Sequence, residues 1–293
     1  MLDLIRLSPR RIFPPGGQDL YRQIALLTHL SPGQELLDVA CGRGVALEYL
    51  VREYGVQGTG VEEDPKLVSL AEDHFKEVGL GSEVSIQGAS PRDLPFRDEI
   101  FDVVVGEVGL AATVEPGEAI RELVRVTKTG GRVVLVQLVW QAPVDEERKE
   151  ALSAHLGARP LMAVELRKLL KEARGGELHT EDWIDVNTAF RSRARKPFPD
   201  FAELFSLGEK LGILERARRR WGWRGVWTVF QREMEVHRLL TRERTLGLNL
   251  LTGVKIPPSE EGDLTKTEAL DGDLQASGLP LFGSEEGERD GRG

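Results

Sequence analysis

A turn with two glycines follows the first apolar segment of the chain. Gly42 and Gly44 come directly after the apolar run that ends at Ala40. Glycine lets the backbone turn tightly and lets a ligand approach the chain closely, and a helix beginning after this turn would present free N–H groups. On its own, the pattern fits a ligand-binding turn and a junction that uses glycine only for packing equally well.

An acid at the end of the next apolar segment favours a ligand-binding turn. Glu62 lies eighteen residues after Gly44 and follows Gly60 and Val61. A carboxylate at the end of the second strand of such a unit is placed to accept hydrogens from both hydroxyls of an adenosine ribose. The spacing therefore predicts a cofactor that contains a nucleoside, either NAD or S-adenosylmethionine.

Two residues favour S-adenosylmethionine. Leu47 stands where the dinucleotide pattern G-x-G-x-x-G has its third glycine. Asp38 lies just before the turn, where a carboxylate would repel a pyrophosphate but attract the ammonium group of a methionine moiety. An NAD-dependent oxidoreductase is therefore a disfavoured alternative.

The elements that must position these residues follow from the hydrophobic pattern. Apolar and amphipathic segments alternate from residue 16 to about residue 175, which predicts βαβ units around a parallel sheet. We expect strands at 35–40, 56–62, 83–87, 101–106 and 132–139, and helices at 44–54 and 116–127. Asp64 and Pro65 are typical of a helix N-cap and first helical position. Further on we expect a helix at 159–173, a strand at 177–186, two or three helices between 190 and 240, and an edge or antiparallel strand at 245–255.

Residues 31–139 resemble the class I (Rossmann-like) S-adenosylmethionine-dependent methyltransferases, especially the broad ubiquinone and menaquinone biosynthesis group. Residues 37–44 resemble the first motif of that family, and Glu62 matches its ribose-binding acid. Residues 90–96 resemble the loop after the third strand, 101–105 the fourth strand, and 121–131 the helix and turn before the fifth. Three positions depart from the usual residues: Ala40 replaces a glycine, Ser90 an aspartate and Thr129 a proline.

The resemblance implies a Rossmann-like, doubly wound α/β fold with a seven-stranded sheet. That sheet is mostly parallel with an antiparallel last strand, has helices on both faces, and carries a helical insertion before the last strand. It also implies S-adenosylmethionine as cofactor. The candidate cofactor-binding residues are Asp38, Ala40, Cys41, Gly42, Gly44, Glu62, Ser90, Pro91, Asp93, Leu94 and, on a helix before the first strand, Tyr21.

The methyl acceptor should lie beyond the carboxyl ends of the strands. Glu107 follows the fourth strand and is the candidate catalytic residue, either as a base or by orienting a substrate hydroxyl; the alternative is a helix cap or a solvated acid. Gln137 and Trp140 could form acceptor walls or be packing residues. We expect a small organic acceptor, methylated by direct displacement at the sulfonium methyl. The five histidines show no metal-ligand spacing, so we expect no metal.

Residues 191–224 combine ten Lys or Arg with four Asp or Glu, and include Trp221 and Trp223. Such a segment could bind RNA, an anionic acceptor or a membrane surface, or could be a solvated helix. An RNA methyltransferase is therefore an alternative function. A cofactor-binding protein without transferase activity is another, because of the departures at Ala40, Ser90 and Thr129.

We expect a single methyltransferase domain over residues 1–257, with a cofactor-binding half at 31–140 and the helical insertion at about 187–243. Residues 258–293 contain ten acidic residues from Ser259 onward against three basic ones, out of a net charge of −9, and are predicted to be a disordered acidic tail. No apolar run is long enough to span a membrane. We expect a cytoplasmic protein; the oligomeric state is open, with a homodimer as one option.

Overall fold

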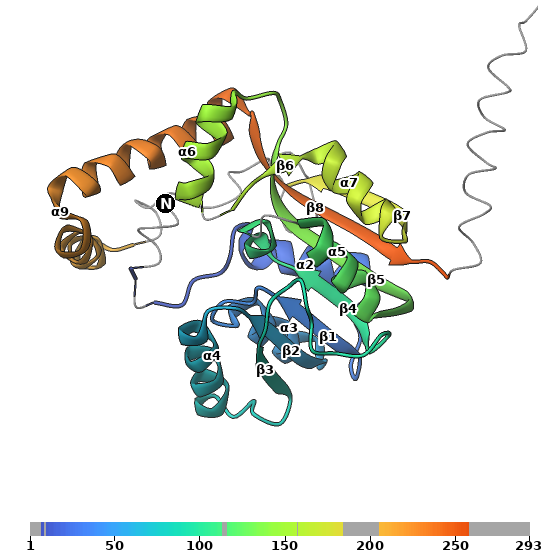
Figure 1. Ribbon diagram of the computed structural model, residues 1–293. Coiled ribbons are helices and arrows are strands. Elements are labelled where there is room, and N and C mark those ends of the chain that lie inside the picture. The colour runs from blue at the N-terminus through green and yellow to red at the C-terminus, as the bar shows by residue number, and fades with distance from the viewer. Residues whose placement is uncertain (1–6, 9, 113–115, 157, 184–204, 258–293) are drawn as a thin grey trace, which may run out of the picture. The chain divides into compact units, whose positions relative to one another are not determined.

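The computed structural model describes residues 7–8, 10–112, 116–156, 158–183 and 205–257 (Figure 1). The described residues as far as Ile256 belong to one compact unit. The predicted acidic tail and residues 187–204 of the expected helical insertion lie outside the described residues.

The sheet has the strand order β3-β2-β1-β4-β5-β8-β7, and β6 pairs with β5 beside this path. The pairs from β3 to β5 are parallel, whereas β8 is antiparallel to both β5 and β7. This confirms the predicted doubly wound sheet with an antiparallel last strand; an eighth, two-residue strand joins it. The strands are β1 (Glu35–Val39), β2 (Gln57–Glu62), β3 (Val84–Gly88), β4 (Phe101–Gly106), β5 (Thr127–Trp140), β6 (Leu161–Met162), β7 (Gly175–Asp182) and β8 (Leu246–Lys255).

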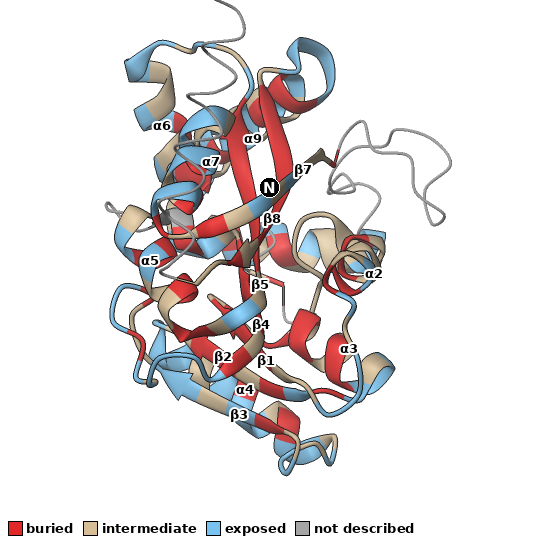
Figure 2. Ribbon diagram, turned by 90° about the vertical axis from the view of Figure 1, so that its right-hand side faces the viewer, coloured by how far each residue is buried: buried red, intermediate tan, exposed pale blue. Residues whose placement is uncertain are grey.

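Helices cover both faces of the sheet, and each face has its own apolar core. Residues of α2, α3 and α4 join one core, and residues of α5 and α7 join the other. Figure 2 shows β5 and β8 buried between helices whose outward sides are exposed, as expected for strands covered on both faces. The helices are α2 (Gly17–Thr28), α3 (Val45–Tyr54), α4 (Pro65–Glu77), α5 (Pro116–Val126), α6 (Glu146–Leu156), α7 (Ala163–Glu172) and α9 (Leu207–Arg238), with short turns η1 (Val108–Ala112) and η2 (Leu239–Glu243).

The start of α4 follows the sequence prediction closely. The Asp64 side chain accepts a hydrogen bond from the Lys66 N–H at 2.9 Å, and Pro65 is the first helical residue. This cap satisfies a backbone donor that the first turn would otherwise leave free. The cap places the helix directly after Glu62, so the acid stays at the end of β2.

Several element boundaries differ from the sequence prediction. β5 begins at Thr127 rather than Arg132, because residues 129–131, expected as a turn, continue the strand past an irregularity in its pairing with β4. The helix expected at 159–173 begins only at Ala163, because Leu161 and Met162 pair with the end of β5. The strand expected at 177–186 is β7, which begins two residues earlier and ends at Asp182.

Candidate active site

The carboxyl ends of β1 and β4 meet at the point where the strand order reverses. Val39 is in register with Gly106, and the Glu107 N–H donates to the Val39 carbonyl at 3.0 Å. In open α/β sheets, ligands bind in the crevice at this switch point. The fold therefore brings the predicted cofactor turn and the predicted catalytic acid to one place.

The two glycines of the turn have different physical roles. Gly44 has φ 66°, and a Cβ there would lie 2.6 Å from Cε2 of Phe75, so α4 packs directly on it. Gly42 has φ 57°, and a Cβ there would meet nothing within 4 Å. Packing thus explains Gly44, whereas Gly42 borders open space that a ligand could occupy.

Three backbone donors hold the Glu62 carboxylate, and one of them belongs to the glycine turn. Its Oε2 accepts from the Gly42 N–H at 2.9 Å, and its Oε1 accepts from the N–H groups of Glu63 and Asp64, each at 3.0 Å. These bonds fix the orientation of the carboxylate, and Oε2, which accepts only one of them, keeps a further acceptor site. The acid and the turn therefore form one preorganised unit at the edge of the sheet.

Two buried carboxyl groups and a buried phenol lie at the centre of the site. Asp38 is 1% exposed, and neither carboxyl oxygen has a hydrogen-bond partner among the described residues. Glu107 is 4% exposed; its Oε1 accepts from the Tyr21 hydroxyl at 2.6 Å, and its Oε2 likewise has no partner in the described part of the chain. A buried polar group without a partner is costly, so these oxygens mark a place for a ligand.

The pKa values of all three groups are raised. Burial, with Glu107 and Glu62 nearby, raises the pKa of Asp38 well above its usual range. Burial raises the pKa of Glu107 to about 7, although the Tyr21 hydrogen bond opposes the shift. Burial and the negative charge of Glu107 raise the pKa of Tyr21. Strong shifts of this kind concentrate at functional sites.

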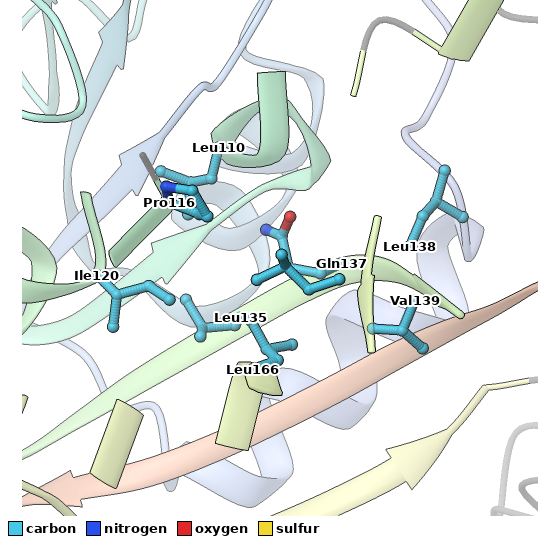
Figure 3. A pocket seen from close by; sticks show the side chains of 9 residues that line it. Leu110, Pro116, Ile120, Leu135, Gln137, Leu138, Val139 and Leu166 are labelled. Carbon is cyan, nitrogen blue, oxygen red and sulfur yellow. The ribbon is translucent and has the colours of Figure 1, made fainter. Parts of the chain in front are cut away.

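Gln137, on β5, supports the backbone that carries Glu107. Its Nε2 donates to the carbonyl oxygens of Gly106 and Glu107 at 3.0 and 2.7 Å, and its Oε1 has no partner within the described residues. Figure 3 shows Gln137 among the apolar side chains that line a small cavity of about 10 Å³. Trp140, the other expected acceptor wall, is 2% exposed and packs in the core. The residues lining the cavity with Gln137 are Leu110, Pro116, Ile120, Leu135, Leu138, Val139, Leu161 and Leu166.

The loop after β3 contributes unequally. The Ser90 hydroxyl oxygen is buried with no partner among the described residues, and Pro91 beside it is buried. Asp93 is exposed, and its N–H donates to the Ser90 carbonyl at 3.1 Å. Leu94 is 3% exposed and packs in the core under α5. Ser90 is thus the side chain of this loop best placed to meet a ligand, whereas Leu94 supports the loop from below.

Ala40 and Cys41 shape the turn through their backbones. Ala40 has φ 65°, a left-handed conformation that glycine adopts at lower cost, and its N–H donates to the Val61 carbonyl at 2.9 Å. Cys41 is 7% exposed, and burial raises the pKa of its thiol. A buried thiol of raised pKa is a poor nucleophile, and contact of Cys41 with the cofactor stays a prediction.

One part of the site had no signal in the sequence. The Arg11 guanidinium donates to the Arg43 carbonyl at 3.0 Å and to Glu48 Oε2 at 2.7 Å, and it also contacts His74. The N-terminal segment is therefore fastened to the glycine turn and to α3. Thirty-two residues separate Arg11 from Arg43, so only the fold reveals the contact.

The donor set fits S-adenosylmethionine. Unpartnered buried carboxyl oxygens favour a cationic ligand, the space at Gly42 admits it, and Glu62 is held at the end of β2 as a ribose-binding acid requires. No group of three or more His, Cys, Asp or Glu that could hold a metal ion occurs in the ranges that the structure describes. The fold and this site together define a nucleoside-binding α/β protein.

Comparison with known proteins shows which proteins the chain resembles. A model described as "Methyltransferase domain" matches residues 37–135. The chain is 26% identical to Methyltransferase GfsG of Streptomyces halstedii over 70% of this chain and 74% of that protein. It is 33% identical to the ubiquinone/menaquinone biosynthesis C-methyltransferase UbiE of Geotalea daltonii (strain DSM 22248 / JCM 15807 / FRC-32) over 36% of this chain and 46% of that protein. The solved structure of the [4+2]-cyclase SpnF superposes with a TM-score of 0.66, at 28% identity and 81% coverage of both chains.

These similarities support a class I S-adenosylmethionine-dependent methyltransferase. Several other curated relatives are matched over only about half of their own length. Within the described residues, no helix combines the length and apolar character needed to cross a membrane.

Proposed function

We propose that this protein transfers the methyl group of S-adenosylmethionine to a hydroxyl of a small organic acceptor. The observation that carries the proposal is the buried group of Asp38, Glu107 and Tyr21 at the carboxyl ends of β1 and β4. One carboxyl there is suited to a cationic cofactor, and the other has a pKa near neutrality. In this pair, Asp38 would bind the cofactor and Glu107 would take part in proton transfer.

Four residues would hold the cofactor. The Asp38 carboxylate would pair with the ammonium group of the methionine moiety, Glu62 would accept from the ribose hydroxyls, Gly42 would admit the ligand to the backbone, and the Ser90 hydroxyl would contact the adenine edge. The bound sulfonium would supply an activated methyl group, so the protein has mainly to align the reactants and exclude water.

Glu107 would receive the proton of the acceptor hydroxyl. Its Oε1 is held by Tyr21, while its Oε2 is free of hydrogen bonds to the described residues. A base works best with a pKa close to the working pH, and burial raises the pKa of Glu107 to about 7. Gln137 would keep Glu107 in place by holding its carbonyl oxygen.

Calorimetric titration of the purified chain with S-adenosylmethionine, S-adenosylhomocysteine and NAD tests the cofactor part. We expect both sulfur ligands to bind and NAD not to bind. Glu62→Ala should abolish binding, whereas Glu63→Ala, an exposed neighbour, should not. Binding of NAD alone, or of no ligand, would contradict the proposal.

A second candidate is a cofactor-binding protein that catalyses a reaction other than methyl transfer, favoured by the likeness to a solved [4+2]-cyclase. Release of S-adenosylhomocysteine separates the two functions. Turnover with a panel of small hydroxylated acceptors, lost in Glu107→Gln, supports methyl transfer. Tight cofactor binding without release across the panel supports the second candidate.

The domain boundaries and the compartment are also proposals. We propose one methyltransferase domain ending near residue 257, because the predicted motifs and β8 all fall before that point. We propose a cytoplasmic location because the chain has a single cysteine, which is typical of proteins from reducing compartments.

A further inference from the structure

The helix α9 carries most of the exposed apolar side chains of the described residues. Of eleven large hydrophobic side chains that are exposed in this part of the chain, seven lie on α9. None of them belongs to the candidate active site. Contiguous exposed apolar surface marks an interaction site more often than scattered exposed residues do. The seven are Leu207, Leu211, Leu214, Trp223, Trp227, Phe230 and Met234.

The second half of α9 presents these side chains as one stripe. Gly222, with φ 66° and ψ 175°, breaks the helix, and Figure 1 shows its two parts running in different directions. Beyond the break, Trp223, Trp227, Phe230 and Met234 recur at intervals of four, three and four residues, which places them on one helical face. They are 71%, 62%, 51% and 56% exposed.

The opposite face of the same helix is fixed to the body of the protein. Val229 and Val236 are buried, and Arg148 of α6 donates to Glu235 at 2.7 Å. The stripe therefore points outward because the helix is held from the other side. Trp227 and Phe230 stack on each other with centroids 6.1 Å apart, so they form a ridge.

Positive charge accompanies the stripe. From Arg216 to Arg232 the chain has six arginines, two of which, Arg218 and Arg219, pair with Glu215 just before this stretch. Arg220 lies over the Trp221 ring at 5.8 Å, and Arg224 next to Trp223 is exposed. At the end of the helix, an open hollow of about 540 Å³ is lined by Met234, Arg238 and Arg242 together with Gln231, Glu235, His237 and Thr241. The hollow thus carries Arg242 and Arg238, of which Arg238 pairs with Glu243, beside the acidic Glu235.

We propose that this face of α9, the Trp223–Met234 stripe with its flanking arginines, docks on the surface of an anionic phospholipid membrane. Aromatic and aliphatic side chains on one helical face enter the boundary between headgroups and acyl chains, while arginines contact the phosphates. The break at Gly222 gives the second half of the helix a direction of its own. The docking goes beyond methyl transfer and does not depend on it.

Two other occupants fit the observations less well. RNA binding uses separate flat rings as stacking platforms, whereas here two of the rings already stack on each other and the stripe ends in methionine. A second copy of the chain would bring two arginine-rich faces together, and like charges in apposition oppose association.

Co-sedimentation of the full chain with vesicles tests the docking, using phosphatidylcholine alone and phosphatidylcholine mixed with phosphatidylglycerol. We expect binding to the mixed vesicles with a blue shift of tryptophan fluorescence, and little binding to the neutral ones. The triple change Trp223→Ser/Trp227→Ser/Phe230→Ser and the double change Arg220→Glu/Arg224→Glu should each weaken binding by at least about tenfold.

Matched variants keep the result specific. Leu26→Ser/Leu70→Ser removes exposed apolar side chains elsewhere, and Lys66→Glu/Lys76→Glu reverses exposed charges on α4; both should bind vesicles as the parent does. Thermal melting and cofactor titration of every variant show that the fold is retained. The proposal is overturned if the parent binds neither vesicle, or if the controls lose binding equally. Two further results overturn it. In both, the parent does not bind vesicles; in one the parent binds RNA and the stripe variant does not, and in the other the parent forms a concentration-dependent dimer that the stripe variant does not form.

Discussion

Glu107 links the site to the stability of the fold. Its pKa is raised to about 7 by burial, so the folded state disfavours its charged form. Above pH 4.5, the ordinary pKa of glutamate, Glu107 is ionised in the unfolded chain. In the folded chain it stays protonated until the pH approaches 7, so the folded state loses stability relative to the unfolded state as the pH rises. The contribution of Glu107 to stability is therefore greatest in acid and is lost between about pH 4.5 and 7.

Glu107→Gln should remove this pH dependence. The amide still accepts from Tyr21 but does not ionise, so the variant should gain up to about 3 kcal/mol of unfolding free energy over the parent at pH 8 and little at pH 4.5. Urea unfolding without cofactor at the two pH values measures the difference. Glu63→Gln, on the surface, should change neither value, and an equal effect of Glu107→Gln at both pH values would contradict the shifted pKa.

Asp38 should couple cofactor binding to proton release. Burial, with Glu107 and Glu62 nearby, raises its pKa, and a cationic ligand favours the ionised form. Affinity for S-adenosylmethionine should therefore rise with pH, with protons released on binding. Calorimetry at pH 6–8 in buffers of different ionisation enthalpy measures the release. In Asp38→Asn, affinity should fall by about tenfold or more and the release should shrink; unchanged release would argue against Asp38 as its source.

At the residue scale, the sequence predicts those site positions whose proposed chemistry depends on local spacing. Asp38, Gly42 and Glu62 stand in a fixed relation to the ends of two strands, so the motif alone indicated them. The Tyr21–Glu107 hydrogen bond joins residues 86 positions apart. Only the packing of α2 against the sheet brings them together.

At the level of elements, the contact between α3 and β2 explains why a leucine replaces the third glycine of the dinucleotide pattern. A Cβ on Gly58 would lie 2.9 Å from Cδ1 of Leu47, and one on Gly60 would lie 3.1 Å from its Cδ2. In the usual pattern a glycine on the helix permits close packing on the strand. Here the glycines are on the strand, and the helix contributes the large side chain.

Gly60→Ala should therefore disturb this contact. The new methyl group would also lie 2.7 Å from Cδ1 of Ile86 and 2.8 Å from the Cys41 sulfur, so overpacking should cost about 1–3 kcal/mol. Thermal or urea unfolding measures the loss. Gly81→Ala is the control because a Cβ there meets nothing within 4 Å. Equal stability of the two variants would show that the α3–β2 contact is not tight.

The ends of helices and strands were predicted correctly where burial on both faces of a strand, or a helix cap, fixes them. β4 was predicted with its observed bounds, and the Asp64 cap was predicted correctly. α6 was not predicted, because its first five residues are all charged and only Leu152, His155 and Leu156 are buried. β6 could not be predicted, since two residues become a strand only by pairing with the end of β5.

On the scale of the whole molecule, the N-terminal segment connects α9 to the cofactor turn. Leu7 and Ile12 pack against a small apolar cluster of Phe205, Ile213, Ala217 and Val229. The Leu7 carbonyl accepts from Arg216 at 2.8 Å. A few residues further on, Arg11 holds the Arg43 carbonyl and Glu48. One short segment therefore contacts both the helix that we propose docks on membranes and the turn that we propose binds the cofactor.

Arg11→Ala should weaken cofactor binding although Arg11 lies outside the predicted motifs. Loss of a charge-assisted hydrogen bond to the Arg43 carbonyl frees the backbone between Gly42 and Gly44, and bonds of this kind contribute about 1.5–3 kcal/mol. If half of that energy serves to preorganise the turn, the dissociation constant for S-adenosylmethionine should rise by about tenfold or less. Arg10→Ala is the control, because Arg10 is 53% exposed in its ion pair with Glu209 and such surface pairs contribute little. Hydrogen exchange at residues 40–44, measured beside the titration, should quicken in Arg11→Ala alone. A variant that unfolds more easily but keeps both its affinity and its exchange rates would mean that Arg11 secures the N-terminal segment without shaping the site.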